Sequence, residues 1–122
     1  MNGHAPEPLV AVVCRVPLLA EALMAALEGI ATVRRFPAER GDTVGLLRAV
    51  DPDAVVVDSE AEAHHAAVFA RATDSALVHV SLYDQILRIF EDGSWHESDE
   101  EASPESIRNA VLGGIFRRER VT

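Results

Sequence analysis

Short apolar runs recur along the first two thirds of the chain. The runs at 9–14, 54–58 and 76–82 are too short for helices and are rich in valine, which predicts buried strands. A fourth run at 31–36, ATVRRF, contains two arginines before Pro37, which predicts a more exposed strand. The sequence therefore indicates four strands before residue 83.

The segments between these strands have helical periodicity. Apolar residues recur at helical spacing from Pro17, which suits a first helical turn, until Gly29. A second helix is predicted from Asp42, a plausible N-cap, and a third over 60–73. Strands that alternate with helices in this way favour a parallel sheet with right-handed crossovers and helices on both faces.

The pattern changes after Leu82, because only residues 83–85 separate the fourth strand from the next apolar run. A parallel crossover needs a dozen or more residues, so the strand over 86–91 should be antiparallel to the fourth. Asp92-Gly93 is typical of a two-residue type I′ turn, which would place Phe90 opposite Trp95. The sequence thus predicts a C-terminal β-hairpin.

The rest of the chain predicts a solvated acidic loop at 96–103 and a final helix, with Ser103 as N-cap and Pro104 at the first helical position. We expect one domain over residues 1–122, with a loose tail at 1–8. The predicted fold class is α/β: a three-layer sandwich with a mostly parallel, doubly wound sheet, an antiparallel C-terminal hairpin and a final helix.

Composition restricts the function classes. The net charge of −9 would repel a phosphate backbone, so we expect no binding to nucleic acid. No long apolar segment is present, so we expect neither a signal peptide nor a membrane span. The single cysteine, Cys14, cannot form an internal disulfide, which fits a cytoplasmic location.

Several polar residues follow the predicted parallel strands. Cys14 and Arg15 follow the first strand, Asp58 and Ser59 the third, and Ser81 the fourth. The carboxyl ends of the strands of a doubly wound sheet converge on one crevice, so these residues should gather there. The sequence PDAVVVD, which ends at Asp58, resembles the third strand of a two-component receiver domain.

The resemblance covers about residues 9–82 and implies a flavodoxin-like fold. It implies that Asp58 occupies the phospho-acceptor position and that Ser81 is the hydroxyl residue that touches the phosphoryl group. Receivers also have an acidic pair after the first strand and a lysine after the fifth. Here Cys14 and Arg15 stand at the first position, and the chain contains no lysine. We therefore expect a degenerate pocket without a metal or cofactor, in which Arg15 forms an ion pair with Asp58.

Three functions remain open. The first is a non-catalytic regulatory or protein-interaction module, a bacterial-type pseudo-receiver that is not an enzyme. The second is a genuine receiver that accepts a phosphoryl group at Asp58. The third is a small-molecule-binding or enzymatic α/β domain that uses the crevice near Cys14, Asp58 and Ser81. Cys14 would need a lowered pKa to act as a nucleophile and is more typical of a buried packing residue. His79, between two valines, is not expected to be a metal ligand.

The predicted hairpin is rich in apolar side chains, more than one face of so small an addition can bury. A hairpin in place of a crossover helix should also leave part of the sheet uncovered. We therefore expect a homodimer, or a complex with another protein, built on the hairpin and the last helix. Phe90 or Trp95 should lie near the centre of that interface, with Ile86 and Ile89 beside them.

Overall fold

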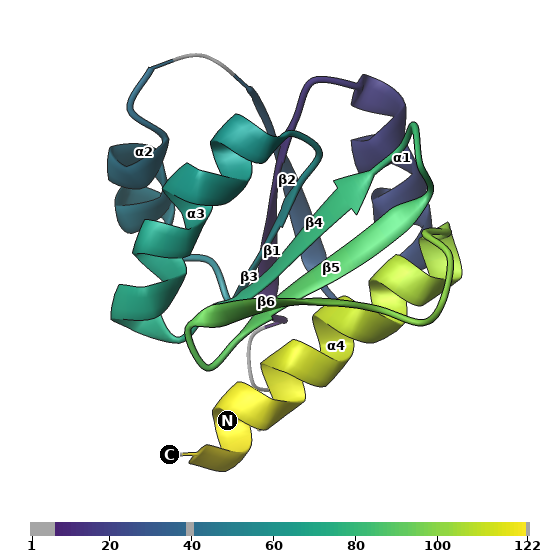
Figure 1. Cartoon of the computed structure of the whole chain (residues 1–122). Coiled ribbons are helices and arrows are strands. Elements are labelled where there is room, and N and C mark those ends of the chain that lie inside the picture. Colours follow the sequence, from purple (N-terminus) through teal and green to yellow (C-terminus); the bar gives the residue numbers. More distant parts are fainter. Residues whose placement is uncertain (1–6, 39–40, 122) are drawn as a thin grey trace.

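A computed structural model describes residues 7–38 and 41–121 and arranges them as six strands and four helices (Figure 1). The elements in chain order are β1 (Leu9–Cys14), α1 (Pro17–Ala26), β2 (Thr32–Pro37), α2 (Thr43–Val50), β3 (Ala54–Val57), α3 (Glu60–Thr73), β4 (Ala76–Ser81), β5 (Ile86–Glu91), β6 (Ser94–Glu97) and α4 (Pro104–Val121). The fold class is α/β, as predicted.

All six strands belong to one mixed sheet, in the order β2-β1-β3-β4-β5-β6. The first four pair in parallel, and each parallel connection runs through a helix. Three of these strands are almost completely buried because helices cover both of their faces, whereas β2 lies at the edge and is largely exposed. This difference confirms the contrast expected from the valine-rich runs and the arginine-containing run at 31–36.

The hairpin has the predicted direction and register. Strand β5 is antiparallel to β4, and β6 is antiparallel to β5. Phe90 pairs with Trp95, and their ring centroids lie 5.1 Å apart. Asp92 and Gly93 have φ angles of 51° and 81°, the left-handed values that a type I′ turn requires. Strand β6 continues to Glu97, so the predicted acidic loop begins at residue 98 rather than 96.

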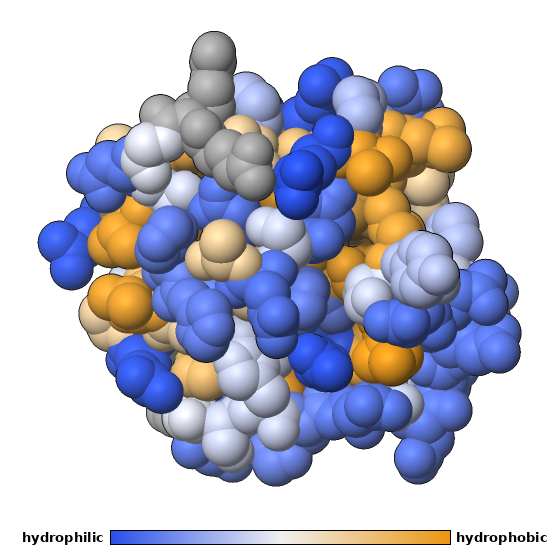
Figure 2. Space-filling model, turned by 45° about the horizontal axis from the view of Figure 1, so that its top comes forward, coloured by the Kyte–Doolittle hydropathy of each residue, from blue (hydrophilic) through white to orange (hydrophobic). Residues whose placement is uncertain are grey.

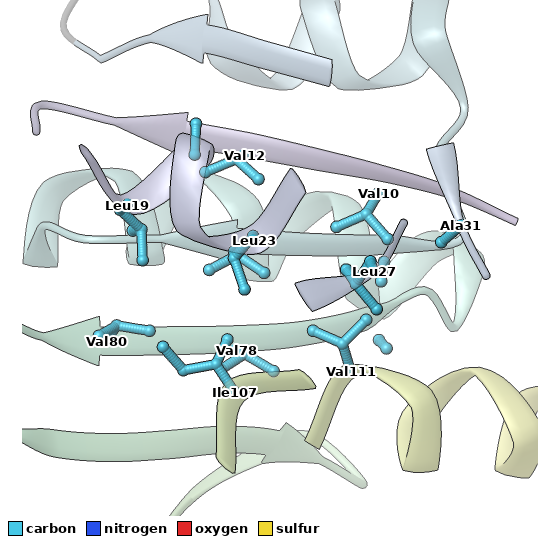
Figure 3. Close-up of a cluster of buried hydrophobic side chains, with 14 of the residues drawn as sticks. Val10, Val12, Leu19, Leu23, Leu27, Ala31, Val78, Val80, Ile107 and Val111 are labelled. Atoms are coloured by element: carbon cyan, nitrogen blue, oxygen red, sulfur yellow. The ribbon is translucent and has the colours of Figure 1, made fainter. Parts of the chain in front are cut away.

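Two layers of helices cover the sheet: α1 and α4 on one side, α2 and α3 on the other (Figure 1). Each layer encloses its own group of buried apolar side chains. Figure 3 shows the first group, in which side chains of α1 and its C-cap, α4, β1 and β4 point toward one another: Leu19, Leu23, Leu27, Ile107, Val111, Val10, Val12, Val78 and Val80. The final helix therefore completes the core and is not an appendage.

Helix α4 is fixed at both ends. At its start, Ser103 accepts a hydrogen bond from the backbone N–H of Ser106, which confirms the predicted N-cap. Near its end, Arg118 forms an ion pair of 3.0 Å with Asp53, whose other carboxylate oxygen accepts the N–H of Leu9. These contacts bind the last helix to the beginnings of β1 and β3. No helix in residues 7–38 and 41–121 is long and apolar enough to cross a membrane.

Candidate functional site

An open cleft of about 610 Å³ lies at the edge of the sheet where the parallel strands end. This edge is at the top of the sheet in Figure 1. Its walls come from the segments that follow β1, β3 and β4 and from β5. The lining residues are Arg15, Val16, Asp58, Ser59, Glu60, His79, Ser81, Leu82, Tyr83, Asp84 and Arg88. Four of the five residues that the sequence predicted for this crevice, namely Arg15, Asp58, Ser59 and Ser81, are therefore brought together.

Asp58 is held by the main chain that follows β1. Its carboxylate accepts the backbone N–H of Arg15 at 2.9 and 3.0 Å and the N–H of Val16 at 3.0 Å. Both carboxylate oxygens are thus used, and the charge is stabilised by fixed amide donors. The predicted ion pair is not formed: both residues are described, and no ion pair between described residues joins the side chains of Arg15 and Asp58. The loop after β1 instead places its main-chain N–H groups within reach of the carboxylate.

The two serines of the cleft make short-range contacts. Ser59 is the N-cap of α3, because its hydroxyl accepts the N–H of Glu62 at 3.3 Å. Ser81, at the end of β4, donates its hydroxyl to the carboxylate of Asp84 at 3.2 Å. Ser59 therefore stabilises a helix, while Ser81 closes the turn that leads into β5.

Cys14 lies apart from the cleft. Its side chain is buried with Val10 and Val12 in the group packed under α1 and α4, because the alternation of a strand sends all three to the same face. Burial raises the pKa of the Cys14 thiol, and the negative charge of Asp58 raises it further. A buried thiol that stays protonated is a packing residue and a poor nucleophile.

Three residues that line the cleft were not predicted from the sequence as site residues: Tyr83, Asp84 and Arg88. They lie in the turn after β4 and in β5, and the antiparallel register pairs Arg88 directly with His79. Tyr83 is almost fully exposed, with a relative accessibility of 97%. The predicted bounds implied another register, because a strand over 76–82 and a connection over 83–85 would pair Leu82 with Ile86, whereas β4 ends at Ser81 and pairs that residue with Ile86.

His79 is buried between the cleft and the hairpin. Its ring packs edge-on against Trp95, with centroids 6.1 Å apart. Burial lowers the pKa of His79, and the positive charge of Arg88 lowers it further. The imidazole is therefore kept neutral at physiological pH. It is a core-lining histidine, and the described residues contain no group of three side chains suited to hold a metal ion.

The residues predicted for an interface occupy two faces of β5 and β6. Phe90 is buried in the group under α2 and α3, where Trp95 is half-buried against it and the guanidinium carbon of Arg71 lies 5.6 Å from its ring centre. Ile86 and Ile89 are half-buried. The hairpin thus uses its aromatic pair to extend the core.

The cleft combines a carboxylate that is fully hydrogen-bonded, a neutral histidine and two arginines, with two further carboxylates at its rim. The chain contains no lysine, and no acidic residue directly follows β1. Metal-assisted phosphoryl transfer depends on a lysine and on carboxylates at that position. Comparison with family models, with curated proteins and with solved structures finds no match to this chain.

Proposed function

We propose that this chain is a non-catalytic regulatory or protein-interaction module, similar to a receiver domain that has lost magnesium-dependent phosphoryl acceptance. The observation that carries this proposal is the binding of Asp58 by main-chain N–H groups. Hydrogen bonds accepted by both oxygens of a carboxylate withdraw electron density from it and lower its nucleophilicity.

The order and direction of the first four strands support the receiver-like part of this proposal. The strand order 2-1-3-4 of the parallel portion is that of doubly wound flavodoxin-like sheets, in which ligands bind near β1 and β3. Asp58 follows β3 at that place, and Ser81 ends β4 beside it. The hairpin in place of a fourth crossover helix is the departure from that plan.

The chemistry around Asp58 supports the loss of phosphoryl acceptance. Transfer of a phosphoryl group requires cations that neutralise its oxygens, which a magnesium ion and a lysine normally supply. Strand β1 ends at Cys14, whose side chain is buried, and the next residue is Arg15. No acidic side chain directly follows β1 to hold magnesium. We therefore expect the protein to function without catalysing phosphoryl transfer.

The test is incubation with acetyl phosphate and magnesium, followed by intact-mass spectrometry at neutral pH, with an active receiver domain treated in parallel. We expect the wild-type protein to keep its mass while the active receiver gains one phosphoryl group. Asp58→Asn is the matched control. A phosphoryl adduct on the wild type that disappears in Asp58→Asn would refute the proposal and establish the phospho-accepting alternative.

The volume of the cleft supports a second candidate function, the binding of a small molecule. About 610 Å³ lies within the range of roughly 300–1,000 Å³ that is usual for ligand pockets. Arg88 and the neutral His79 would provide polar contacts. A thermal-shift screen against small organic anions would test it, with Arg88→Ala as the control. A stabilisation that persists in Arg88→Ala would exclude this cleft as the binding site.

A further inference from the structure

A second depression, next to the cleft, is lined almost entirely by apolar side chains. This apolar groove, of about 180 Å³, lies between the start of α1 and the start of α4. Its exposed walls include Val16, Leu18, Leu82 and Pro104. Figure 2 brings this end of the molecule forward and shows hydrophobic side chains gathered on the side where α1 lies.

The groove exposes large side chains that a folded protein normally buries. Leu18 has a relative accessibility of 69%, Leu82 of 43% and Val16 of 41%. Single exposed apolar residues are common on protein surfaces, but several around one depression mark an interaction site. Leu18 is the most exposed of the three and projects from the first turn of α1.

The size of the groove indicates the kind of ligand. A volume of about 180 Å³ is below the range of roughly 300–1,000 Å³ that is usual for small-molecule pockets. It is better suited to one or two large side chains of a partner. An amphipathic helix supplies such anchors along one face, at positions i, i+3, i+4 and i+7.

The charged residues near the groove indicate the sign of the charge that a partner should carry. Among the described residues, no charged side chain lines the groove. Within three residues of its lining residues along the described chain, six exposed carboxylates stand against one exposed arginine, Arg15, and one half-buried arginine, Arg108. The carboxylates are Glu21, Asp84, Asp99, Glu100, Glu101 and Glu105. The backbone N–H of Ala102 donates to the carbonyl of Gln85, which fixes the end of the acidic loop beside the groove.

We infer that the apolar groove binds an amphipathic helix of another protein, one that carries large apolar side chains on one face and lysine or arginine on the other. This inference rests on the proposed function as a protein-interaction module and names its surface and partner. A second copy of this chain is the less suitable occupant, because a symmetric contact would bring the same acidic residues together.

The groove and the cleft share two residues, Val16 and Leu82. The backbone N–H of Val16 donates to Asp58 in the cleft, while its side chain lines the groove. A helix bound in the groove therefore contacts the segment that holds Asp58. Binding should perturb the amide resonances of Arg15 and Val16, although those residues belong to the adjacent site.

The experiment uses two synthetic amphipathic helical peptides with the same leucine face, one with lysine and one with glutamate on the polar face. Binding to the isotope-labelled protein is followed by NMR. We expect saturable binding of the lysine peptide, with shifts at Leu18, Leu82 and the Val16 amide, and much weaker binding of the glutamate peptide. Raising the salt concentration from about 0.05 to about 0.5 M should weaken the binding of the lysine peptide.

Leu18→Ser tests the groove without changing the charge. Loss of one buried leucine contact should lower the affinity of the lysine peptide at least about tenfold. Val68→Ser is the matched control: Val68 is 50% exposed on α3, on the opposite side of the sheet, and its replacement should change the affinity less than about twofold. Circular dichroism of both variants verifies that they fold.

Three results would overturn the inference. The first is the absence of saturable binding by the lysine peptide. The second is equal weakening by Leu18→Ser and Val68→Ser, which would mean non-specific adsorption. The third is a wild-type dimer, seen by sedimentation, that Leu18→Ser dissociates, because a second copy would then occupy the groove. None of these depends on phosphorylation of Asp58, so the mass measurement separates a failure of this inference from a failure of the proposed function.

Discussion

Replacing Asp58 with alanine would remove the acceptor that holds the segment after β1. The carboxylate accepts the N–H groups of Arg15 and Val16 at 2.9–3.0 Å. Hydrogen bonds to a charged group contribute about 1.5–3 kcal/mol when they are shielded from water. These lie in an exposed loop, where water replaces the lost acceptor. We therefore expect Asp58→Ala to lower the free energy of unfolding by about 1–2 kcal/mol.

Asp58→Asn should have a smaller effect. The amide keeps one oxygen that can accept a hydrogen bond, but it loses the charge and presents an NH₂ group where the second oxygen stood. Because Oδ2 alone accepts both the Arg15 and the Val16 N–H in the wild type, the amide oxygen can keep these two hydrogen bonds without the charge, and we expect a loss of about 0.5–1 kcal/mol. The order of stability should be wild type, Asp58→Asn, Asp58→Ala.

Arg15→Ala distinguishes a main-chain contact from an ion pair, because alanine keeps the N–H that donates to Asp58. In a double-mutant cycle with Asp58→Ala, the coupling free energy should stay below about 0.5 kcal/mol. The assay is equilibrium unfolding in urea, followed by circular dichroism. A coupling of 1 kcal/mol or more, on the order found for contacting charged side chains, would refute the main-chain assignment and restore the predicted ion pair.

Two further predictions concern the packing of α4 and the state of His79. A Cβ added at Gly114 would meet the Cβ of Ala76 at 2.6 Å, whereas one at Gly113 meets nothing within 4 Å. In urea unfolding, Gly114→Ala should therefore destabilise the protein by about 1–2 kcal/mol and Gly113→Ala should stabilise it by about 0.5–1 kcal/mol; equal effects would contradict the close packing. Since burial lowers the pKa of His79 from 6.5, the unfolded state binds its proton more readily, and stability should fall as the pH drops through 6.5. His79→Gln should lose less stability than the wild type between about pH 7.5 and about pH 5.5, and parallel pH profiles would contradict this.

The arrangement of strands and helices could be predicted from the sequence because period and length distinguish them. Valine-rich runs of strand length alternate with helical periodicity up to Leu82, and the connection of three residues after it excludes a parallel crossover. Asp92-Gly93 fixed the register that pairs Phe90 with Trp95. These features depend on local sequence, and each was confirmed by the structure.

The candidate site was predictable only in part. The ends of the parallel strands brought Asp58 and Ser81 together, but the donors that hold Asp58 are main-chain N–H groups, which every residue type except proline provides. Their position depends on the path of the loop after β1. The burial of Cys14 followed from strand alternation. The exposure of Leu18 depends on how closely α1 and α4 pack, and no pattern of apolar residues defines the distance between two helices.

The hairpin determines where the last helix begins. Strand β5 reverses the direction of β4, and β6 reverses it again, so the chain leaves the sheet in the direction that it had at the end of β4. Helix α4 therefore begins at the same edge as the other three helices. With one added strand it would begin at the opposite edge, and Pro104 would lie far from Val16. The even number of added strands is thus what brings the groove beside the cleft.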